Sequence, residues 1–365
     1  MTSAYLSTNR ATGAIRADVL AGPEPNAAFL REEKAFGKLG LEEKVAVVLS
    51  AVPRIFQLET TSRCNLRCPL CSTHHLKRGY SEMGLESVRR IMEDNPRAAY
   101  ACLHLMGEPL MSRSLFPIVR YLKEQGVYTY FASNGMLLGQ NTGPILDSGL
   151  DKISISLDGI DQQDLARYRV GANFDRIVSG IRALKAERLA RGLTRPLIQT
   201  QTIMFEYNEG KENEVIRFLK SLDVDRVKLK RPSFDTFGGK NDASGGFLRQ
   251  NGKAKEGKYS RRSGSYVKYR DRAVCRLLFQ GFALSDGSVV PCCIDYDGEA
   301  AFGNINERPW REIWGSKKRR EVLKRFFQDE LSICKTCSLG YGYAATIFDR
   351  ARQESAGNLQ AAFRS

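Results

Sequence analysis

Three cysteines lie close together in the segment TTSRCNLRCPLCS, with the spacing C-x3-C-x2-C. Cys64, Cys68 and Cys71 follow directly after the first stretch with strand character. Three thiolates on one tight loop cannot complete a structural zinc site, because such a site requires four ligands. An iron–sulfur cube held by three cysteines leaves one iron open for another ligand. The spacing therefore predicts an iron–sulfur cluster with one open coordination position.

A second group of cysteines lies in the C-terminal third of the chain. Cys334 and Cys337 form a C-x2-C pair, and Cys275 with the adjacent Cys292 and Cys293 can supply two more ligands. Four thiolates would complete either a zinc site or an iron–sulfur cluster, and the spacing alone does not choose between them. Because neighbours on a strand point to opposite faces, only one of the adjacent pair normally reaches such a site.

The other candidate side chains carry weaker signals. Asp295, three residues beyond Cys292, is a candidate base near the second cysteine group, and a role in the hairpin turn is equally open. Cys102 has the sequence context of a buried core thiol. The three histidines, His74, His75 and His104, have no acidic or metal-binding pattern around them.

Alternating strand-like and helical stretches must position these residues. From Arg54 to about Arg231, apolar runs alternate with amphipathic helical periods. We predict strands at Ile55–Glu59, Cys102–Met106, Tyr128–Ser133, Ile153–Leu157, Leu197–Met204 and Arg226–Leu229. Six such alternations predict an α/β fold with a parallel sheet, a partial (β/α)6 TIM-type barrel, because a complete eight-unit barrel would need more chain.

The flanking segments suggest further units. A helix is predicted over Asn26–Leu49, and an Asp286-Gly287 turn between β-prone runs predicts a hairpin. We predict an N-terminal helical extension, the barrel, a basic glycine-rich linker, a small C-terminal cluster-binding extension and a tail, over residues 1–52, 53–235, 236–270, 271–340 and 341–365.

The chain of 365 residues has a formal net charge of +15, which favours an anionic partner. Between Arg226 and Arg272 there are 14 basic and 4 acidic residues. The longest dense apolar stretch, Val45–Val52, is far shorter than the roughly 20 residues of a membrane-spanning helix, so we expect no membrane association. Nine cysteines cannot all pair, and the N-terminus has no secretory pattern, so we expect a cytoplasmic protein with reduced thiols.

The first cysteine segment resembles that of the radical S-adenosylmethionine (SAM) superfamily. The resemblance implies that Cys64, Cys68 and Cys71 hold a [4Fe–4S] cluster whose open iron binds SAM. It further implies that SAM is cleaved to methionine and a 5′-deoxyadenosyl radical, which abstracts hydrogen from a substrate. Leu70 departs from the aromatic residue that often precedes the third cysteine in this family.

Further segments, each after a predicted barrel strand, match the family. Met106-Gly107-Glu108-Pro109 resembles the glycine–glutamate motif, whose carboxylate holds the SAM amino group, with Met106 replacing its first glycine. Ser133-Asn134-Gly135 resembles the motif after the third strand, and Ser156-Leu157-Asp158 resembles the polar pair that meets the SAM ribose. Arg169 stands where related enzymes carry an arginine that pairs with the SAM carboxylate.

The C-terminal cysteine pattern resembles the SPASM or twitch extension of these enzymes, which holds auxiliary iron–sulfur clusters. Five cysteines allow one closed auxiliary [4Fe–4S] cluster, and do not support a second. The resemblance implies ligation by Cys275, Cys292, Cys334 and Cys337, since Cys292 follows Gly287 at the family's usual interval.

These resemblances predict a radical SAM oxidoreductase that dehydrogenates a sugar- or aminocyclitol-type small molecule, in free, phosphorylated or nucleotide-linked form. Flavodoxin or ferredoxin would donate the electrons. The alternative is a SPASM peptide maturase that crosslinks or epimerises its substrate, although the N-terminal extension is short for a peptide-recognition domain. Cys293 occupies the place where sulfatase-maturing relatives carry an aspartate, which argues against that activity. Nucleic-acid binding through the basic segment is a third, less favoured interpretation.

Overall fold

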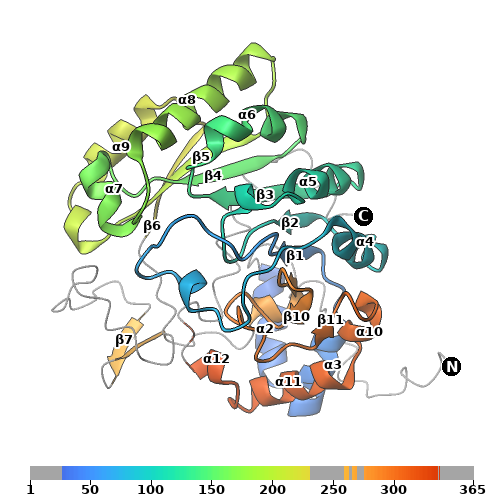
Figure 1. Ribbon diagram of the computed structural model, residues 1–365. Coiled ribbons are helices and arrows are strands. Elements are labelled where there is room, and N and C mark those ends of the chain that lie inside the picture. Colours follow the sequence, from blue (N-terminus) through green and yellow to red (C-terminus); the bar gives the residue numbers. More distant parts are fainter. Residues whose placement is uncertain (1–26, 231–258, 263–264, 269–274, 336, 338–365) are drawn as a thin grey trace.

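The computed structural model describes residues 27–230, 259–262, 265–268, 275–335 and 337. Its central sheet confirms the predicted partial barrel (Figure 1). Six strands pair in parallel and in chain order: β1 (Ile55–Leu58), β2 (Tyr100–Cys102), β3 (Tyr128–Ser133), β4 (Lys152–Ser156), β5 (Leu197–Ile203) and β6 (Arg226–Lys230). The carboxyl ends of these strands therefore lie along one rim, as the candidate site requires.

The second strand lies earlier in the chain than the predicted Cys102–Met106. The main chain leaves the sheet after Cys102, although Leu103 N still donates to Tyr130 O at 2.7 Å. The side chain of Gln57 then donates to His104 O at 2.7 Å, in place of a strand partner. The apolar residues beyond Cys102 thus belong to the loop that carries the glycine–glutamate motif.

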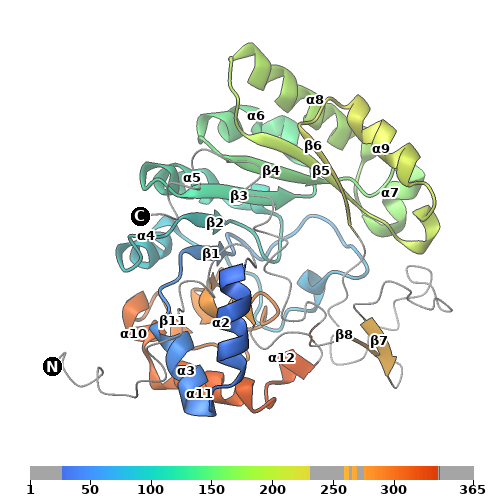
Figure 2. The same cartoon turned by 180° about the vertical axis from the view of Figure 1, so that it is seen from behind.

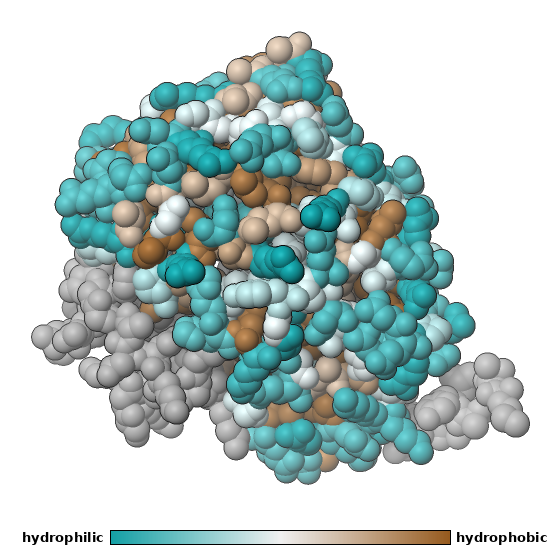
Figure 3. All heavy atoms as spheres, in the orientation of Figure 1, coloured by the Kyte–Doolittle hydropathy of each residue, from teal (hydrophilic) through white to brown (hydrophobic). Residues whose placement is uncertain are grey.

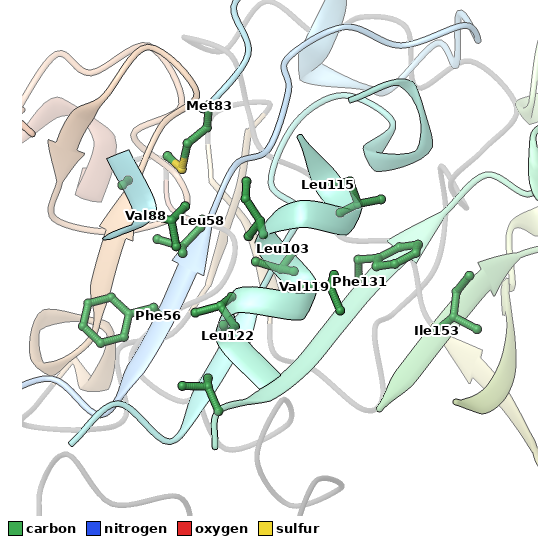
Figure 4. Packing of buried hydrophobic residues seen from close by; sticks show 14 of the residues in the cluster. Phe56, Leu58, Met83, Val88, Leu103, Leu115, Val119, Leu122, Phe131 and Ile153 are labelled. Carbon is green, nitrogen blue, oxygen red and sulfur yellow. The ribbon is translucent and has the colours of Figure 1, made fainter. Parts of the chain in front are cut away.

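Helices cover the outer face of the sheet (Figure 1). They are α4 (Leu85–Glu93), α5 (Leu115–Glu124), α6 (Leu138–Asp147), α7 (Gln162–Tyr168), α8 (Phe174–Ala190) and α9 (Glu212–Ser221). Figure 4 shows the packing on this side, where Leu58 and Phe131 from the strands lie near Val119 and Leu122 of α5. Alternate strand residues point to the opposite, inner face.

The C-terminal hairpin extends the same sheet. β9 (Gly281–Ala283) pairs in parallel with the free edge of β1, and β10 (Ser288–Val290) and β11 (Gly303–Asn304) follow antiparallel, giving a nine-stranded sheet. The predicted turn lies between β9 and β10, where Gly287 has a φ of +90°. The second cysteine group is therefore built onto the barrel by backbone pairing.

The N-terminal extension forms two helices, α2 (Ala27–Gly37) and α3 (Leu41–Ser50), where one continuous helix was predicted. Gly40 adopts an extended conformation between them, and its N–H donates to Glu43 Oε2 at 2.8 Å. Both helices lie beside the C-terminal helices α10 (Trp310–Trp314), α11 (Lys317–Phe327) and α12 (Ser332–Lys335) (Figure 2). Trp314 Nε1 donates to Ala51 O at 2.9 Å, so the extension stabilises the C-terminal unit.

Part of the predicted linker is structured. β7 (Tyr259–Arg262) and β8 (Ser265–Lys268) form an antiparallel pair, as their tyrosine and valine residues favour. Residues 236–258 of this linker and the predicted tail, 341–365, lie outside the described residues. Hydrophilic side chains cover most of the face in Figure 3, and none of the described helices is long and apolar enough to cross a membrane.

Candidate active site

The first cysteine group lies on the loop that follows β1. Cys71 N donates to Cys68 O at 3.0 Å, which forms a turn within the loop, and Arg67 N donates to Val170 O at 3.0 Å, which connects the loop to the segment after α7. Burial is the main cause that raises the pKa of the Cys64 thiol to about 11. The three thiols lie near one another, so Cys68 and Cys71, like the Glu108 carboxylate, also raise this pKa. Three sulfur donors converging on one partly buried place fit a cluster ligated by Cys64, Cys68 and Cys71.

Gly107 lets the glycine–glutamate loop approach the cysteine loop. Its φ is +72°, and a Cβ there would lie 2.3 Å from Thr61 O and 2.8 Å from Arg63 O. Gly107 N donates to Thr73 Oγ1 at 3.2 Å, and Glu108 N donates to Arg63 O at 2.7 Å. A side chain at this position would push the two loops apart, which explains the glycine in physical terms.

Glu108 joins three of the matched segments. Its carboxylate is buried and accepts hydrogen bonds from Asn134 N at 2.6 Å and Leu110 N at 3.1 Å. Burial raises the pKa of Glu108, and these hydrogen bonds oppose the rise. Asn134 Nδ2 donates to Asn65 Oδ1 at 2.7 Å and lies 3.8 Å from Cys64 Sγ. The cysteine loop and the segments around Glu108 and Asn134 therefore form one structure.

Asp158 and Arg169 form a buried ion pair beside the cysteines. Arg169 Nε lies 2.5 Å from Asp158 Oδ2, and its Nη1 lies 3.8 Å from Cys68 Sγ. The other Asp158 oxygen accepts from Ile203 N at 2.6 Å. Burial lowers the pKa of Arg169, but the combined effect of the Asp158 carboxylate, Cys68 and Tyr168 is larger, and the net pKa is raised. A permanent positive charge is thus held against the first cysteine group.

The two serines that were predicted to contact SAM, Ser133 and Ser156, lie in different parts of the structure. Ser133 Oγ accepts from Gly135 N at 3.0 Å, which stabilises the turn after β3. Gly135 has a φ of +83°, and a Cβ there would lie 2.7 Å from Ile177 Cγ2. Ser156 Oγ accepts from Gln201 Nε2 at 3.0 Å on the inner face of the sheet. Of the predicted SAM contacts, Ser156 is thus the one that faces the barrel interior from within a strand.

The second cysteine group also converges. Burial raises the pKa of Cys292 well above its usual value, and the thiols of the other members raise it further. Burial likewise raises the pKa of Cys275 to about 12, with contributions from Cys337 and Cys334. Four partly buried sulfur donors from separate parts of the chain fit a closed cluster. No three histidine, cysteine or acidic side chains in the described ranges are placed to hold a single metal ion.

An apolar layer connects the second cysteine group with the inner face of the barrel. Its buried members are Ile55, Tyr100, Cys102, Tyr128, Leu277, Phe282, Leu284 and Val290. Four of the second group's cysteines pack against this layer: Cys275, Cys292, Cys293 and Cys337. Since β1, β2 and β3 contribute to the same layer, the cysteine group lies against the barrel interior.

Asp295 lies in the turn beyond Cys292. Its two carboxylate oxygens accept hydrogen bonds from Glu299 N at 2.8 Å and Ala300 N at 2.9 Å. Burial raises the pKa of Asp295 to about 6, and these backbone donors oppose the rise. The contacts provide the turn-stabilising role that the sequence left open, and the role of base stays a prediction.

Two histidines occupy places that sequence reasoning did not assign. His74 Nε2 lies 2.7 Å from Leu66 O and so braces the first cysteine loop. His104 faces the inner side of the barrel, where its Nδ1 accepts from Ala132 N at 3.1 Å and lies 3.2 Å from Cys102 Sγ. Cys102 is buried, as expected of a core thiol. In the sequence, the indication for His104 was its position two residues after the strand residue Cys102, which places both side chains on the same face of the sheet.

A buried ion pair that the sequence analysis did not predict connects the barrel with the C-terminal hairpin. Arg78 Nη2 lies 2.6 Å from Glu59 Oε2, and Arg78 Nε donates to Tyr296 O at 2.6 Å. Glu59 also accepts from Ser285 N at 2.8 Å, Ser285 Oγ at 2.6 Å and Met106 N at 3.2 Å. One carboxylate therefore contacts the segment after the first cysteines, the glycine–glutamate loop and the C-terminal hairpin.

Comparison with known proteins agrees with these two centres. The family model described as the radical SAM superfamily matches residues 58–219, and the SPASM model, described as an iron–sulfur cluster-binding domain, matches residues 275–338. A "PqqA peptide cyclase" of Rhodopseudomonas palustris is 29% identical over 198 residues, which cover 53% of this chain and 50% of that protein. The chain thus matches about half the length of that relative.

A "tungsten-containing aldehyde ferredoxin oxidoreductase cofactor-modifying protein" of Pyrococcus furiosus is 24% identical over 315 residues, covering 77% of this chain and 86% of that protein. Among solved structures, Streptococcus suis SuiB bound to SAM aligns with a TM-score of 0.55 and 14% identity over 88% of this chain and 80% of that one. At 14% identity, the similarity to the SuiB structure shows a common fold. The chain thus carries a radical SAM domain at residues 58–219 and a C-terminal SPASM iron–sulfur cluster-binding domain at residues 275–338.

Proposed function

We propose that this protein oxidises its substrate by removing a hydrogen atom and then an electron. The observation that carries the proposal is the arrangement of two cysteine groups about one barrel interior, with the apolar inner layer in contact with the second group. When bound, SAM and the two iron–sulfur clusters supply a 5′-deoxyadenosyl radical and an acceptor for the second electron.

The residues of the chain hold and orient these groups. Cys64, Cys68 and Cys71 would hold the cluster that binds SAM. Glu108 would receive the SAM amino group, because its carboxylate is oriented by two backbone N–H groups and retains further lone pairs. Arg169, fixed by Asp158, would pair with the SAM carboxylate.

The auxiliary cluster would be held by Cys275, Cys292, Cys334 and Cys337. The apolar layer packs against Cys275, Cys292 and Cys337 and would keep water from the path between them and the barrel interior. We infer that an external reductant such as flavodoxin or ferredoxin supplies electrons, and that the protein works in the cytoplasm, where its thiols stay reduced.

We propose a sugar- or aminocyclitol-type small molecule as the substrate, with a secondary alcohol oxidised to a ketone. Hydrogen-bonding side chains support this choice, since the inner-face pairs Gln199–Ser154 and Gln201–Ser156 each join at 3.0 Å. Peptide crosslinking or epimerisation is the second candidate. It is favoured by the similarity to the PqqA peptide cyclase.

The test uses anaerobically reconstituted protein with a reductant, SAM and two substrate panels, aminocyclitols and short peptides. With substrate deuterated at the reacting carbon, 5′-deoxyadenosine should gain one mass unit in each turnover. Cys334→Ala should still cleave SAM but make little oxidised product. Transfer of a methyl group with S-adenosylhomocysteine as the co-product, and no 5′-deoxyadenosine, would overturn the proposal.

A further inference from the structure

Each sulfur of the first cysteine group has a hydrogen-bonding side chain beside it. The three pairs are Asn134 Nδ2 at 3.8 Å from Cys64 Sγ, Arg169 Nη1 at 3.8 Å from Cys68 Sγ, and Thr73 Oγ1 at 3.4 Å from Cys71 Sγ. Asn134 and Arg169 are predicted SAM contacts, whereas the sequence motifs give Thr73 no role. The shortest of the three distances therefore involves a residue outside those motifs.

Thr73 is held in place beside Cys71. It lies in the short 3-10 helix Ser72–His75, directly after the third cysteine, and it is only 2% exposed. Its Oγ1 accepts a hydrogen bond from Gly107 N at 3.2 Å. A threonine hydroxyl can accept and donate at the same time, so its own proton remains available for a further acceptor.

Two sulfur atoms lie within reach of the Thr73 hydroxyl. Cys71 Sγ is 3.4 Å away, and the thioether sulfur of Met106 is 3.7 Å away. A thioether is a weak, uncharged acceptor. A cysteine that ligates a metal is a thiolate, which carries negative charge and has no proton to donate. Thr73 is therefore the donor, and Cys71 the preferred acceptor, when Cys71 is a ligand.

A hydrogen bond to a ligand sulfur changes how readily an iron–sulfur cluster accepts an electron. Reduction adds negative charge, so a donor at the sulfur stabilises the reduced form more than the oxidised form. Hydrogen bonds to the sulfurs are accordingly among the features that set the reduction potential of such clusters. The effect is larger for a buried donor such as Thr73, because the protein interior screens the interaction less than water does.

We propose that the Thr73 hydroxyl donates a hydrogen bond to Cys71 and thereby raises the reduction potential of the cluster at the first cysteine group. Thr73 acts through Cys71 and is a positioning residue. Because the same oxygen accepts from Gly107 N, Thr73 also connects this sulfur to the loop that carries Glu108. The inference rests on the part of the proposed function that makes Cys71 a cluster ligand, and it does not depend on the substrate.

The experiment is a potentiometric titration of the anaerobically reconstituted protein, without SAM or substrate, followed by electron paramagnetic resonance. The signal to follow is the one that is absent from Cys64→Ala/Cys68→Ala/Cys71→Ala. Thr73→Val keeps the shape of the side chain and removes the hydroxyl. It should lower the ratio of reduced to oxidised cluster at a fixed potential about threefold to tenfold, which is a midpoint about 30 to 60 mV more negative for one electron.

Two control variants separate the hydroxyl from a general disturbance of the fold. Thr73→Ser retains the hydroxyl and should keep the parent potential. Thr142→Val removes the hydroxyl of another buried threonine, which donates to Leu138 O at 3.1 Å within α6, and should also keep the parent potential. Iron analysis verifies that each variant carries the same cluster content as the parent.

An unchanged potential in Thr73→Val, or an equal shift in Thr73→Ser or Thr142→Val, would overturn the inference. If Thr73→Val does not assemble the cluster, Thr73→Ala takes its place in the comparison. Failure of both variants to assemble it would also overturn the inference, because the hydroxyl would then be a structural requirement. A parent protein without this signal would refute ligation by Cys71. The expected shift, together with failure to form 5′-deoxyadenosine from any substrate, would refute the proposed reaction alone.

Discussion

Replacing Arg78 by methionine should destabilise the connection between the barrel and the C-terminal unit. Arg78 contacts both Glu59 carboxylate oxygens, at 2.6 and 2.7 Å, and the side chains are 7% and 0% exposed. The substitution leaves a buried carboxylate whose remaining donors are Ser285 and Met106. Removing one partner of a buried ion pair commonly costs about 3 to 5 kcal/mol.

The neighbouring residue provides a matched control. Lys77 Nζ lies 3.1 Å from Glu299 Oε1, but the Lys77 side chain is 77% exposed. Both residues thus form an ion pair from the same segment, one in solvent and one buried. Because water screens the exposed pair, Lys77→Met should change the unfolding midpoint far less than Arg78→Met.

The assay is urea unfolding of the anaerobic holoprotein, followed by tryptophan fluorescence. Trp310 and Trp314, the only two tryptophans, both lie in α10 and report on the C-terminal unit. Arg78→Met should lower the midpoint by about 1 M or more, for slopes of a few kcal/mol per molar urea. Adding Glu59→Gln should recover part of the loss, because no buried charge remains. Equal midpoints for Arg78→Met and Lys77→Met, or no recovery in the double variant, would refute this reasoning.

Three further predictions concern the two centres. Cys292→Ala should lose the auxiliary cluster, leaving about four of about eight iron atoms, while Cys293→Ala keeps it; iron analysis would show the reverse if the assignment is wrong. Gly107→Ala should reduce occupancy of the SAM-binding cluster, because the added Cβ would lie 2.3 Å from a main-chain oxygen. The control Gly84→Ala, at a position with open space around it, should keep full occupancy, and the visible absorption of the cluster measures the difference. His104 has a folded pKa near 3, below its unfolded value of about 6.5, so stability should fall by about 2 kcal/mol from pH 8 to pH 5 and His104→Gln should remove that component of the slope.

The barrel could be predicted from the sequence because the apolar runs and helical periods that indicate its elements each lie within a short stretch of chain. The strand after Arg226 and the strands around Ile153 and Tyr128 were visible from alternating or continuous apolar runs between helical periods. The boundary of β2 was not, because Leu103 and Leu105 keep the apolar signal after the backbone has left the sheet. Hydrophobicity reports burial, and a buried loop gives the same signal as a strand.

Long-range partners account for most of what the sequence did not reveal. Glu59 and Ser285 are 226 residues apart, and no local pattern relates them. The break between α2 and α3 had a local signal in Gly40, which a helical period on both sides concealed. The motif residues around Glu108 and Asp158 were found by resemblance, whereas their mutual contacts required the fold.

The continuity of the sheet gives the two cysteine groups a common frame. β1 pairs with β2 on one edge and with β9 on the other, and its carboxyl end leads into the first cysteine loop. Gly281 of β9 lies so close to the buried Phe56 ring that a Cβ there would be 2.4 Å from it, so the pairing is also a tight packing contact. Glu59, one residue beyond β1, then binds both halves through Arg78 and Ser285. The relative position of the two cysteine groups is therefore set by the register and packing of a single strand.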